Sequence, residues 1–161
     1  MHISHYDPAW CSTKRREHPF DLKVAIELLD AMADAGMNLL IVDCEDGVEY
    51  MSHPELKRPY TVPMERLAEL ACAAHERDID VVPKLNFSKS GRNLHDMWMR
   101  PHWDPFSWLD NIDVYWKVAS DLISELVTVC EPRSFFHIGM DEDHYRSLKQ
   151  YVAAIKTFRK M

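Results

Sequence analysis

The chain has 161 residues, the length of one domain, and 47% of them are hydrophobic and 28% charged, as in an ordinary globular protein. Its 19 Lys and Arg residues stand against 26 Asp and Glu residues, which gives a formal net charge of −7. This acidic balance argues against a nucleic-acid partner, which needs a basic face, and against an anionic membrane surface.

The sequence shows no membrane or export signal. No apolar run approaches the roughly 20 residues of a transmembrane helix, and the N-terminal MHISHYDPAW lacks the regions of a signal peptide. Cys11, Cys44, Cys72 and Cys130 lie far apart without C-x-x-C spacing, so we predict no zinc site, no other metal and no cofactor. The compartment stays unknown, with the cytoplasm as the default.

In chain order, the sequence predicts four strands, each followed by a helix. Short apolar runs indicate the strands, and apolar residues at helical spacing indicate the helices. The predicted pairs are strand 1–6 with helix 21–36, strand 37–44 with helix 62–78, strand 79–87 with helix 111–130, and strand 133–139 with helix 145–161. The segment 88–110 has no regular period and, at this length, is typical of a functional loop.

This alternation predicts an α/β fold with a parallel sheet and right-handed crossovers. Two architectures fit, a doubly wound sheet or part of a (β/α)8 barrel. With four glycines and no G-x-G-x-x-G after a strand, a dinucleotide-binding sheet is disfavoured. A complete barrel of TIM type has about 250 residues and eight units. We therefore interpret residues 1–161 as one incomplete barrel domain with about four βα units, a half barrel.

Polar residues follow each predicted strand, and in a barrel such residues meet at the C-terminal mouth, where the chemistry of these enzymes lies. They are His5 and Asp7, then Asp43, Glu45 and Asp46, then Lys84 and Asn86, and finally Asp141 and Glu142. His2 is expected on the surface. We expect Phe135 and Phe136 to form an apolar floor beneath the last two acids.

A carboxyl group above such an apolar floor, beside another carboxylate, holds its proton more tightly. A general acid that works near neutral pH needs this property. The alternative is that the acids of this stretch stabilise the start of the following helix through its dipole, with Asp143 as the simplest cap.

The segment FFHIGMDE resembles the H-x-G-G-D/N-E signature of glycoside hydrolase family 20, the β-N-acetylhexosaminidases. Upstream, LDAMADAGMNLLIVDCEDG resembles that family's helix and acid-bearing second strand, and DIDVVPKLNFSKS resembles its third strand. The matches run in order over about residues 20 to 145. The resemblance implies a TIM-barrel enzyme that removes terminal N-acetylhexosamines with retention of configuration.

The resemblance also implies roles for individual residues. Glu142 matches the general acid and base, and Asp141 matches the residue that orients the substrate's 2-acetamido group. The oxygen of that group attacks the anomeric carbon in place of an enzyme carboxylate. His137 matches the signature histidine, which supports the site. The sugar-binding acid of the second strand matches Asp46, or Asp43 if the register slips by three.

Several positions depart from the family pattern. Met140 replaces the second glycine of the signature, Asn86 stands where an aspartate is expected, and Ser90 stands where a histidine is expected. The arginine of the first strand has no clear counterpart, and the later strands are missing. The resemblance therefore supports a sugar hydrolase, but with these departures it does not fix a specificity for N-acetylhexosamine.

Other residues have two interpretations each. Trp98 and Trp103, with Trp108, form either a sugar-stacking platform or a cluster that closes the long loop onto the domain. Lys84 is interpreted as a sugar-binding or salt-bridged lysine rather than a Schiff base. Trp116 is predicted to lie in the core.

Three functional hypotheses remain open. The first is a retaining, substrate-assisted glycosidase, and the second is a retaining glycosidase whose nucleophile lies on a missing later strand. The third is a catalytically silent carbohydrate-binding half barrel. In each, the partner is a carbohydrate. The exposed edges of a half barrel also predict pairing with a second copy or with a missing C-terminal half.

Overall fold

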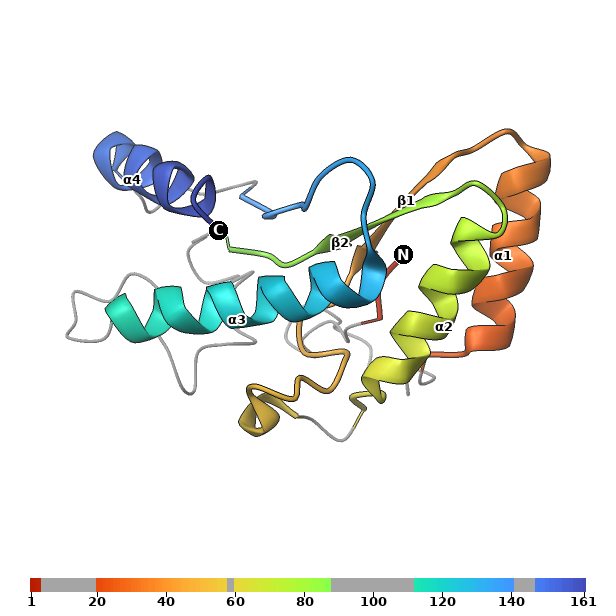
Figure 1. Ribbon diagram of the computed structural model, residues 1–161, viewed down its shortest axis with the longest axis horizontal. Helices are drawn as coiled ribbons and strands as arrows, with labels where there is room; N and C mark the ends of the chain where they lie inside the picture. The colour runs from red at the N-terminus through yellow and green to blue at the C-terminus, as the bar shows by residue number, and fades with distance from the viewer. Residues whose placement is uncertain (4–19, 58–59, 88–111, 141–146) are drawn as a thin grey trace, which may run out of the picture.

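Two parallel strands, β1 (Leu39–Asp43) and β2 (Asp80–Lys84), form the centre of the structure (Figure 1). It is a computed structural model that describes residues 1–3, 20–57, 60–87, 112–140 and 147–161. Leu39 pairs with Asp80 at one end of the ladder and Asp43 with Lys84 at the other. Both strands are apolar because both faces of a parallel sheet are covered.

A short parallel segment flanks each side of this pair. His2 bridges Asp43 on one side, and His137 bridges Lys84 on the other. In the described residues, the four segments therefore lie side by side in chain order. Residues 4–6 of the first predicted strand lie outside those residues.

The predicted strand 133–139 is wrong in its extent, because it contributes a single bridge at His137. Gly139 has a φ of +48°, in the left-handed region, so the extended conformation ends directly after the bridge. At the other end, the side chain of Asp80 binds the backbone N–H of Arg133 at 2.8 Å and the hydroxyl of Ser134 at 2.5 Å. These contacts fix the entry and the exit of the segment.

All four predicted helices are confirmed, with slightly shorter bounds than predicted. They are α1 (Leu22–Asp34), α2 (Met64–His75), α3 (Ile112–Cys130) and α4 (Leu148–Phe158), and a short 3-10 turn covers Pro54–Leu56. Asp21 caps α1 by accepting a hydrogen bond from Lys23 N at 2.9 Å. Ser147 and Gln150 form a capping box that starts α4.

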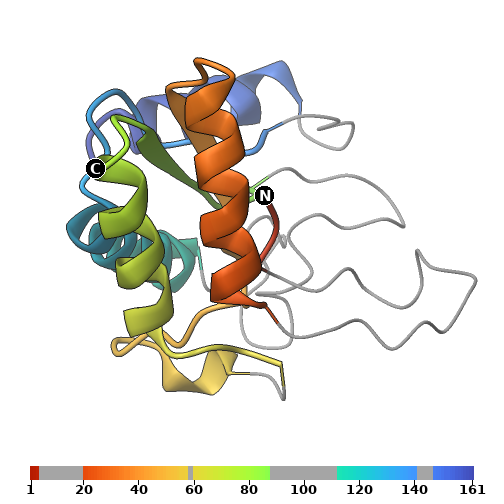
Figure 2. The same ribbon diagram turned by 90° about the vertical axis from the view of Figure 1, so that its right-hand side faces the viewer.

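The core lies between the strands and the helices that cover them. Figure 2 shows α1 and α2 side by side. Leu70 of α2, Val81 of β2 and Leu122 of α3 are fully buried. None of the helices in the described part of the chain is long and apolar enough to cross a membrane.

An aromatic cluster fastens α4 to the rest of the molecule. The ring of Phe158 lies 4.8 Å from that of Phe87, beyond the end of β2, and 5.2 Å from that of Trp116 on α3. Tyr115 packs edge-on against Phe87. Trp116 is therefore packed against the core, as predicted from the sequence.

Candidate functional site

An ion pair joins the C-terminal ends of β1 and β2. Asp43 and Lys84 are register partners, and Lys84 Nζ lies 2.9 Å from Asp43 Oδ2. His2, from the neighbouring segment, places its Nδ1 3.3 Å from the same oxygen. The side chain of Asp43 is only 6% exposed and that of Lys84 17%. Two neighbouring parallel segments therefore place Lys84 and His2 against the buried carboxylate of Asp43.

The environment of Asp43 favours its ionised form. Burial alone raises the pKa of a carboxyl group. Here the hydrogen bonds and positive charges of His2 and Lys84 outweigh burial, and the pKa of Asp43 lies below its usual value. The other oxygen, Oδ1, is buried and lacks a hydrogen-bond partner within the described part of the chain.

Glu45 has the opposite environment two residues later. Burial raises its pKa well above the usual value, and the negative charges of Asp43 and Asp46 raise it further. A hydrogen bond with the Asp43 side chain acts in the same direction. The carboxyl group of Glu45 therefore keeps its proton to higher pH than an exposed glutamate does.

The loop after β1 holds Glu45 and Asp46 in fixed positions. Glu45 has a φ of +34°, unusual for a residue with a side chain, and its carbonyl accepts a 2.6 Å hydrogen bond from the Tyr50 hydroxyl. Asp46 is buried, and its Oδ2 accepts a 2.7 Å hydrogen bond from the Tyr60 hydroxyl. Thr61 binds the Asp46 carbonyl at 2.8 Å.

Gly139 lets the segment around His137 press against the end of β2. A Cβ atom at this position would lie 2.8 Å from Asn86 Cα and 2.9 Å from Leu85 O, closer than real Cβ atoms come. The backbone N–H of Gly139 also donates a 3.0 Å hydrogen bond to His137 Nδ1. Asn86, only 2% exposed, is thereby held between the two segments.

The structure brings five of the predicted site residues to one edge of the sheet. They are Asp43, Asp46, Lys84, Asn86 and His137. The other four, Asp141, Glu142, Trp98 and Trp103, lie outside the described residues. Of the two readings of Lys84, the salt-bridged lysine is the one observed. Among the residues described, no group of three or more His, Cys, Asp and Glu side chains is arranged to hold a metal.

The prediction of an apolar floor from Phe135 and Phe136 is wrong for Phe135, which is 47% exposed. Adjacent residues of an extended segment point to opposite faces, so only Phe136 packs against the core.

Sequence reasoning missed the part played by His2. It lies on the surface, as expected, with a side chain 45% exposed, but it also contacts Asp43. Its partner lies 41 residues away, so only the pairing register of the two segments could have revealed the contact. Glu45 was recognised as one of the polar residues after the second strand, but its partly buried environment, which raises its pKa, was not predicted. Three acids within four residues were the available signal.

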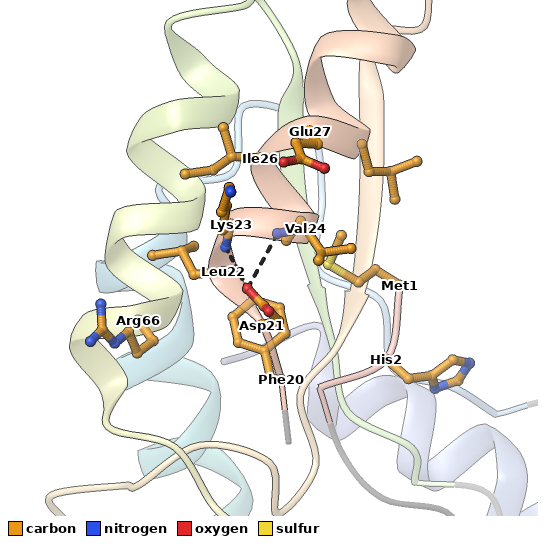
Figure 3. Close-up of a pocket in the computed structure, with 12 residues that line it drawn as sticks. Met1, His2, Phe20, Asp21, Leu22, Lys23, Val24, Ile26, Glu27 and Arg66 are labelled. Atoms are coloured by element: carbon orange, nitrogen blue, oxygen red, sulfur yellow. Dashed lines mark hydrogen bonds between the residues drawn. The ribbon is translucent and has the colours of Figure 1, made fainter. Parts of the chain in front are cut away.

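A hollow elsewhere on the molecule does not contain the predicted site residues. It lies along α1, and Met1, His2 and Phe20 contribute to its lining (Figure 3). Because its remaining walls come mainly from α1, it belongs to the flank of the sheet rather than to the edge where the strands end.

Comparison with known proteins gives matches at the level of structure. No family model and no curated protein sequence matches the chain. The β-N-acetylhexosaminidase of glycoside hydrolase family 20 from Streptomyces coelicolor A3(2) superposes with a TM-score of 0.68 at 20% identity, over 89% of this chain and 34% of that one. The N-acetyl-β-hexosaminidase of Streptomyces plicatus, in complex with Thio-NAglucal, gives a TM-score of 0.64 at 21% identity, over 86% and 33%.

A chitobiase of Flavobacterium johnsoniae gives a TM-score of 0.59 at 25% identity, over 87% of this chain and 24% of that one. The chain thus spans about a third or less of the length of these enzymes. The likeness extends over nearly nine-tenths of the chain itself, and at this level of identity it establishes a shared fold. The structural neighbours of this chain are therefore β-N-acetylhexosaminidases of glycoside hydrolase family 20.

Proposed function

We propose that this chain forms about half of the catalytic (β/α)8 barrel of a glycoside hydrolase that acts on β-linked N-acetylhexosamine sugars. The observation that carries the proposal is the Asp43–Lys84 pair, with His2 and His137 bridged on either side. Polar side chains from four parallel segments in chain order thus gather at the edge where barrel enzymes hold their substrates. The fold shared with family 20 enzymes supports the same assignment.

The proposed reaction is retaining and assisted by the substrate. Glu142 protonates the glycosidic oxygen, and the bond from that oxygen to the anomeric carbon breaks. Asp141 orients the 2-acetamido group, whose carbonyl oxygen forms the new bond to the anomeric carbon. Water then opens this intermediate while Glu142, now ionised, takes its proton. In the sequence, these two residues follow Gly139 after one intervening residue, Met140, and Gly139 is packed against the end of β2.

Sugar hydroxyl groups are the proposed ligands of the polar side chains around this edge. Carboxylate and amide oxygens accept hydrogen bonds from hydroxyl groups, and the ammonium and amide N–H groups donate to them. Asp43 or Asp46, Asn86, Lys84 and His137 have these chemistries. Trp98 and Trp103 are proposed to stack on the apolar faces of the sugar rings.

The proposal is tested with 4-nitrophenyl N-acetyl-β-glucosaminide and the variants Glu142→Gln and Asp141→Asn. Removal of the general acid is expected to lower kcat by roughly 10²- to 10⁴-fold. Asp143→Asn is the matched control, because it removes a neighbouring carboxylate that has no proposed part in the reaction. Wild-type turnover by Glu142→Gln would overturn the assignment of the acid.

The same assay separates the two remaining hypotheses. If 2-hydroxy and 2-acetamido substrates are hydrolysed at similar rates, the nucleophile is a carboxylate on another strand. A catalytically silent module would bind N-acetylglucosamine without turnover. Asn86 and Met140, which stand where the family pattern has an aspartate and a glycine, are the observation that favours this last alternative.

A further inference from the structure

The segment just before α2 lies alongside the loop that follows β1. Val62 forms an isolated parallel bridge with Val48. Its backbone N–H donates a 2.9 Å hydrogen bond to the carbonyl of Gly47, and its carbonyl accepts a 2.9 Å hydrogen bond from Glu49 N. Backbone hydrogen bonds therefore join two stretches that the 3-10 turn Pro54–Leu56 separates in the sequence.

Two consecutive side chains of this segment hold Asp46 at different atoms. The Tyr60 hydroxyl donates a 2.7 Å hydrogen bond to Asp46 Oδ2. The Thr61 hydroxyl donates a 2.8 Å hydrogen bond to the backbone carbonyl of Asp46. Thr61 therefore fixes the backbone at this position, whereas Tyr60 fixes the orientation of the carboxyl group.

The position of Tyr60 is itself fixed by the core. α2 begins at Met64, and its Leu67 and Leu70 are fully buried, so the chain that leads into this helix has little freedom. The bridge at Val62 holds the same stretch from the other side. Tyrosine has two side-chain rotatable bonds and loses little conformational entropy when it holds a partner. A hydroxyl supported in this way orients another side chain precisely.

Burial gives this orientation a consequence for binding. Asp46 is only 5% exposed, and a buried carboxyl group depends on donors from the protein for its hydrogen bonds. Without the Tyr60 hydroxyl, the Asp46 side chain would turn toward other donors. Its oxygens would then no longer face a ligand in the same geometry.

Tyr50 provides a comparison within the same loop. Its hydroxyl donates a 2.6 Å hydrogen bond, but the acceptor is the backbone carbonyl of Glu45. Both tyrosines therefore stabilise the loop after β1. Of the two, Tyr60 is the one whose hydroxyl contacts a carboxyl group with a proposed part in sugar binding.

We propose that Tyr60 is the positioning residue of Asp46 and that its hydroxyl aims the Asp46 carboxylate at hydroxyl groups of a neutral sugar. Hydroxyl groups donate to a carboxylate, whereas an anionic group of a ligand would be repelled by it. The inference rests on the proposed function, in which the second-strand acid binds the substrate. It assigns that part to Asp46, because Asp43 is held by Lys84 and His2 instead.

The affinity of the full chain for N-acetylglucosamine, measured from amide chemical shifts, tests the inference. Tyr60→Phe removes the hydroxyl and keeps the ring, and it is expected to weaken binding roughly tenfold. Tyr50→Phe is the matched control, because it removes a hydroxyl that bonds to the same loop, and its affinity should equal that of the wild type. In the hydrolysis assay, Tyr60→Phe should raise KM and leave kcat nearly unchanged, because Asp46 binds substrate and transition state alike.

A double-mutant cycle with Asp46→Ala shows whether Tyr60 acts through Asp46. Asp46→Ala alone should weaken binding, and the addition of Tyr60→Phe should then weaken it no further. Unchanged binding by Asp46→Ala, additive losses in the cycle, or equal affinities of Tyr60→Phe and Tyr50→Phe would overturn the inference and leave the proposed function in place. The comparison of the two tyrosine variants does not require Asp46→Ala to fold. A wild type that binds no N-acetylglucosamine would overturn the proposed function and the inference with it.

Discussion

Glu45 and Asp43 are two carboxyl groups, two residues apart, whose environments shift their pKa values in opposite directions. Lys84 and His2 stabilise the ionised form of Asp43, while burial and the charge of Asp43 itself stabilise the protonated form of Glu45. Such pairs are common where proteins bind or process polar substrates. The acids are visible in the sequence, but their division into one ionised and one protonated group depends on contacts across the sheet.

The raised pKa of Glu45 predicts a pH-dependent stability. The unfolded chain titrates near the usual value of 4.5, and the folded chain titrates higher. The contribution of Glu45 to the free energy of unfolding is therefore fully present below pH 4.5. It is lost as the pH rises through the pKa that Glu45 has in the folded protein. The Glu45→Gln side chain stays neutral and can still donate a hydrogen bond. The free energy of unfolding of this variant should therefore rise relative to that of the wild type as the pH increases above 4.5.

Urea unfolding of wild type and Glu45→Gln at a series of pH values between 5 and 8 measures this difference. Asp43 acts in the opposite sense, because its lowered pKa gives stability above about pH 3.8 that is lost in acid. Its effect therefore lies outside the measured range. A difference between the two proteins that does not change with pH would show that Glu45 is ionised in the folded protein.

The close packing around Gly139 predicts that a larger residue at this position destabilises the protein. Gly139→Ala places a Cβ atom 2.8 Å from the backbone of Asn86 at a φ of +48°, so both contact and conformation are unfavourable. We expect a loss of about 2–4 kcal/mol in the free energy of unfolding. The control is Gly36→Ala, where φ is +73° and nothing lies within 4 Å. It should cost about 1 kcal/mol from conformation alone.

Denaturant unfolding of both variants checks the comparison. Equal losses for the two substitutions would mean that the segment around His137 is not pressed against β2. That result would remove the physical reason for placing Asn86 and His137 together.

At the scale of elements, helices were predictable because their apolar spacing and capping residues are local. Asp21, Gly36 and Ser147 each mark a helix boundary through contacts within a few residues. The bridges at His2 and His137 were harder to delimit. Their pairing depends on partners about 40 to 50 residues away, and the left-handed conformation of Gly139 ends the last segment early.

Asp80 predicts how that last segment is anchored. Its carboxylate accepts hydrogen bonds from Arg133 N and Ser134 Oγ. The substitution Asp80→Ala removes this acceptor, so both donors lose their hydrogen bond to it. We expect a loss of about 1–3 kcal/mol in the free energy of unfolding. These hydrogen bonds lower the pKa of Asp80 against the effect of burial, so its contribution should fade as the pH drops below about 3.8.

Thermal or urea unfolding at neutral pH measures the effect of Asp80→Ala, with Glu76→Ala, at an exposed position, as its control. A loss no larger than that of the control would show that the segment after α3 holds its place without Asp80. The contact between His137 and Lys84 would then need another explanation.

At the scale of the whole molecule, the alternation of strands and helices predicted the parallel order, and the structure confirms that order for the segments it describes. Closure into a barrel was not predictable in the same way, because it depends on pairing between segments far apart in the sequence, and the described residues show only the pairing of β1 with β2 and the bridges beside them. Val24 on α1 and Leu148 on α4 are exposed apolar residues on the outer helices.

The central claim is that the strand ends form a carbohydrate site, and amide chemical shifts measured during titration with N-acetylglucosamine test it most directly. The account predicts saturable shifts at residues 43–46, 84–87 and 137–139, with none on the outer face of α2. Galacturonate, which has a similar ring but no acetamido group, is the control ligand and should bind more weakly. Shifts confined to other surfaces, or no saturable shift at all, would contradict the account.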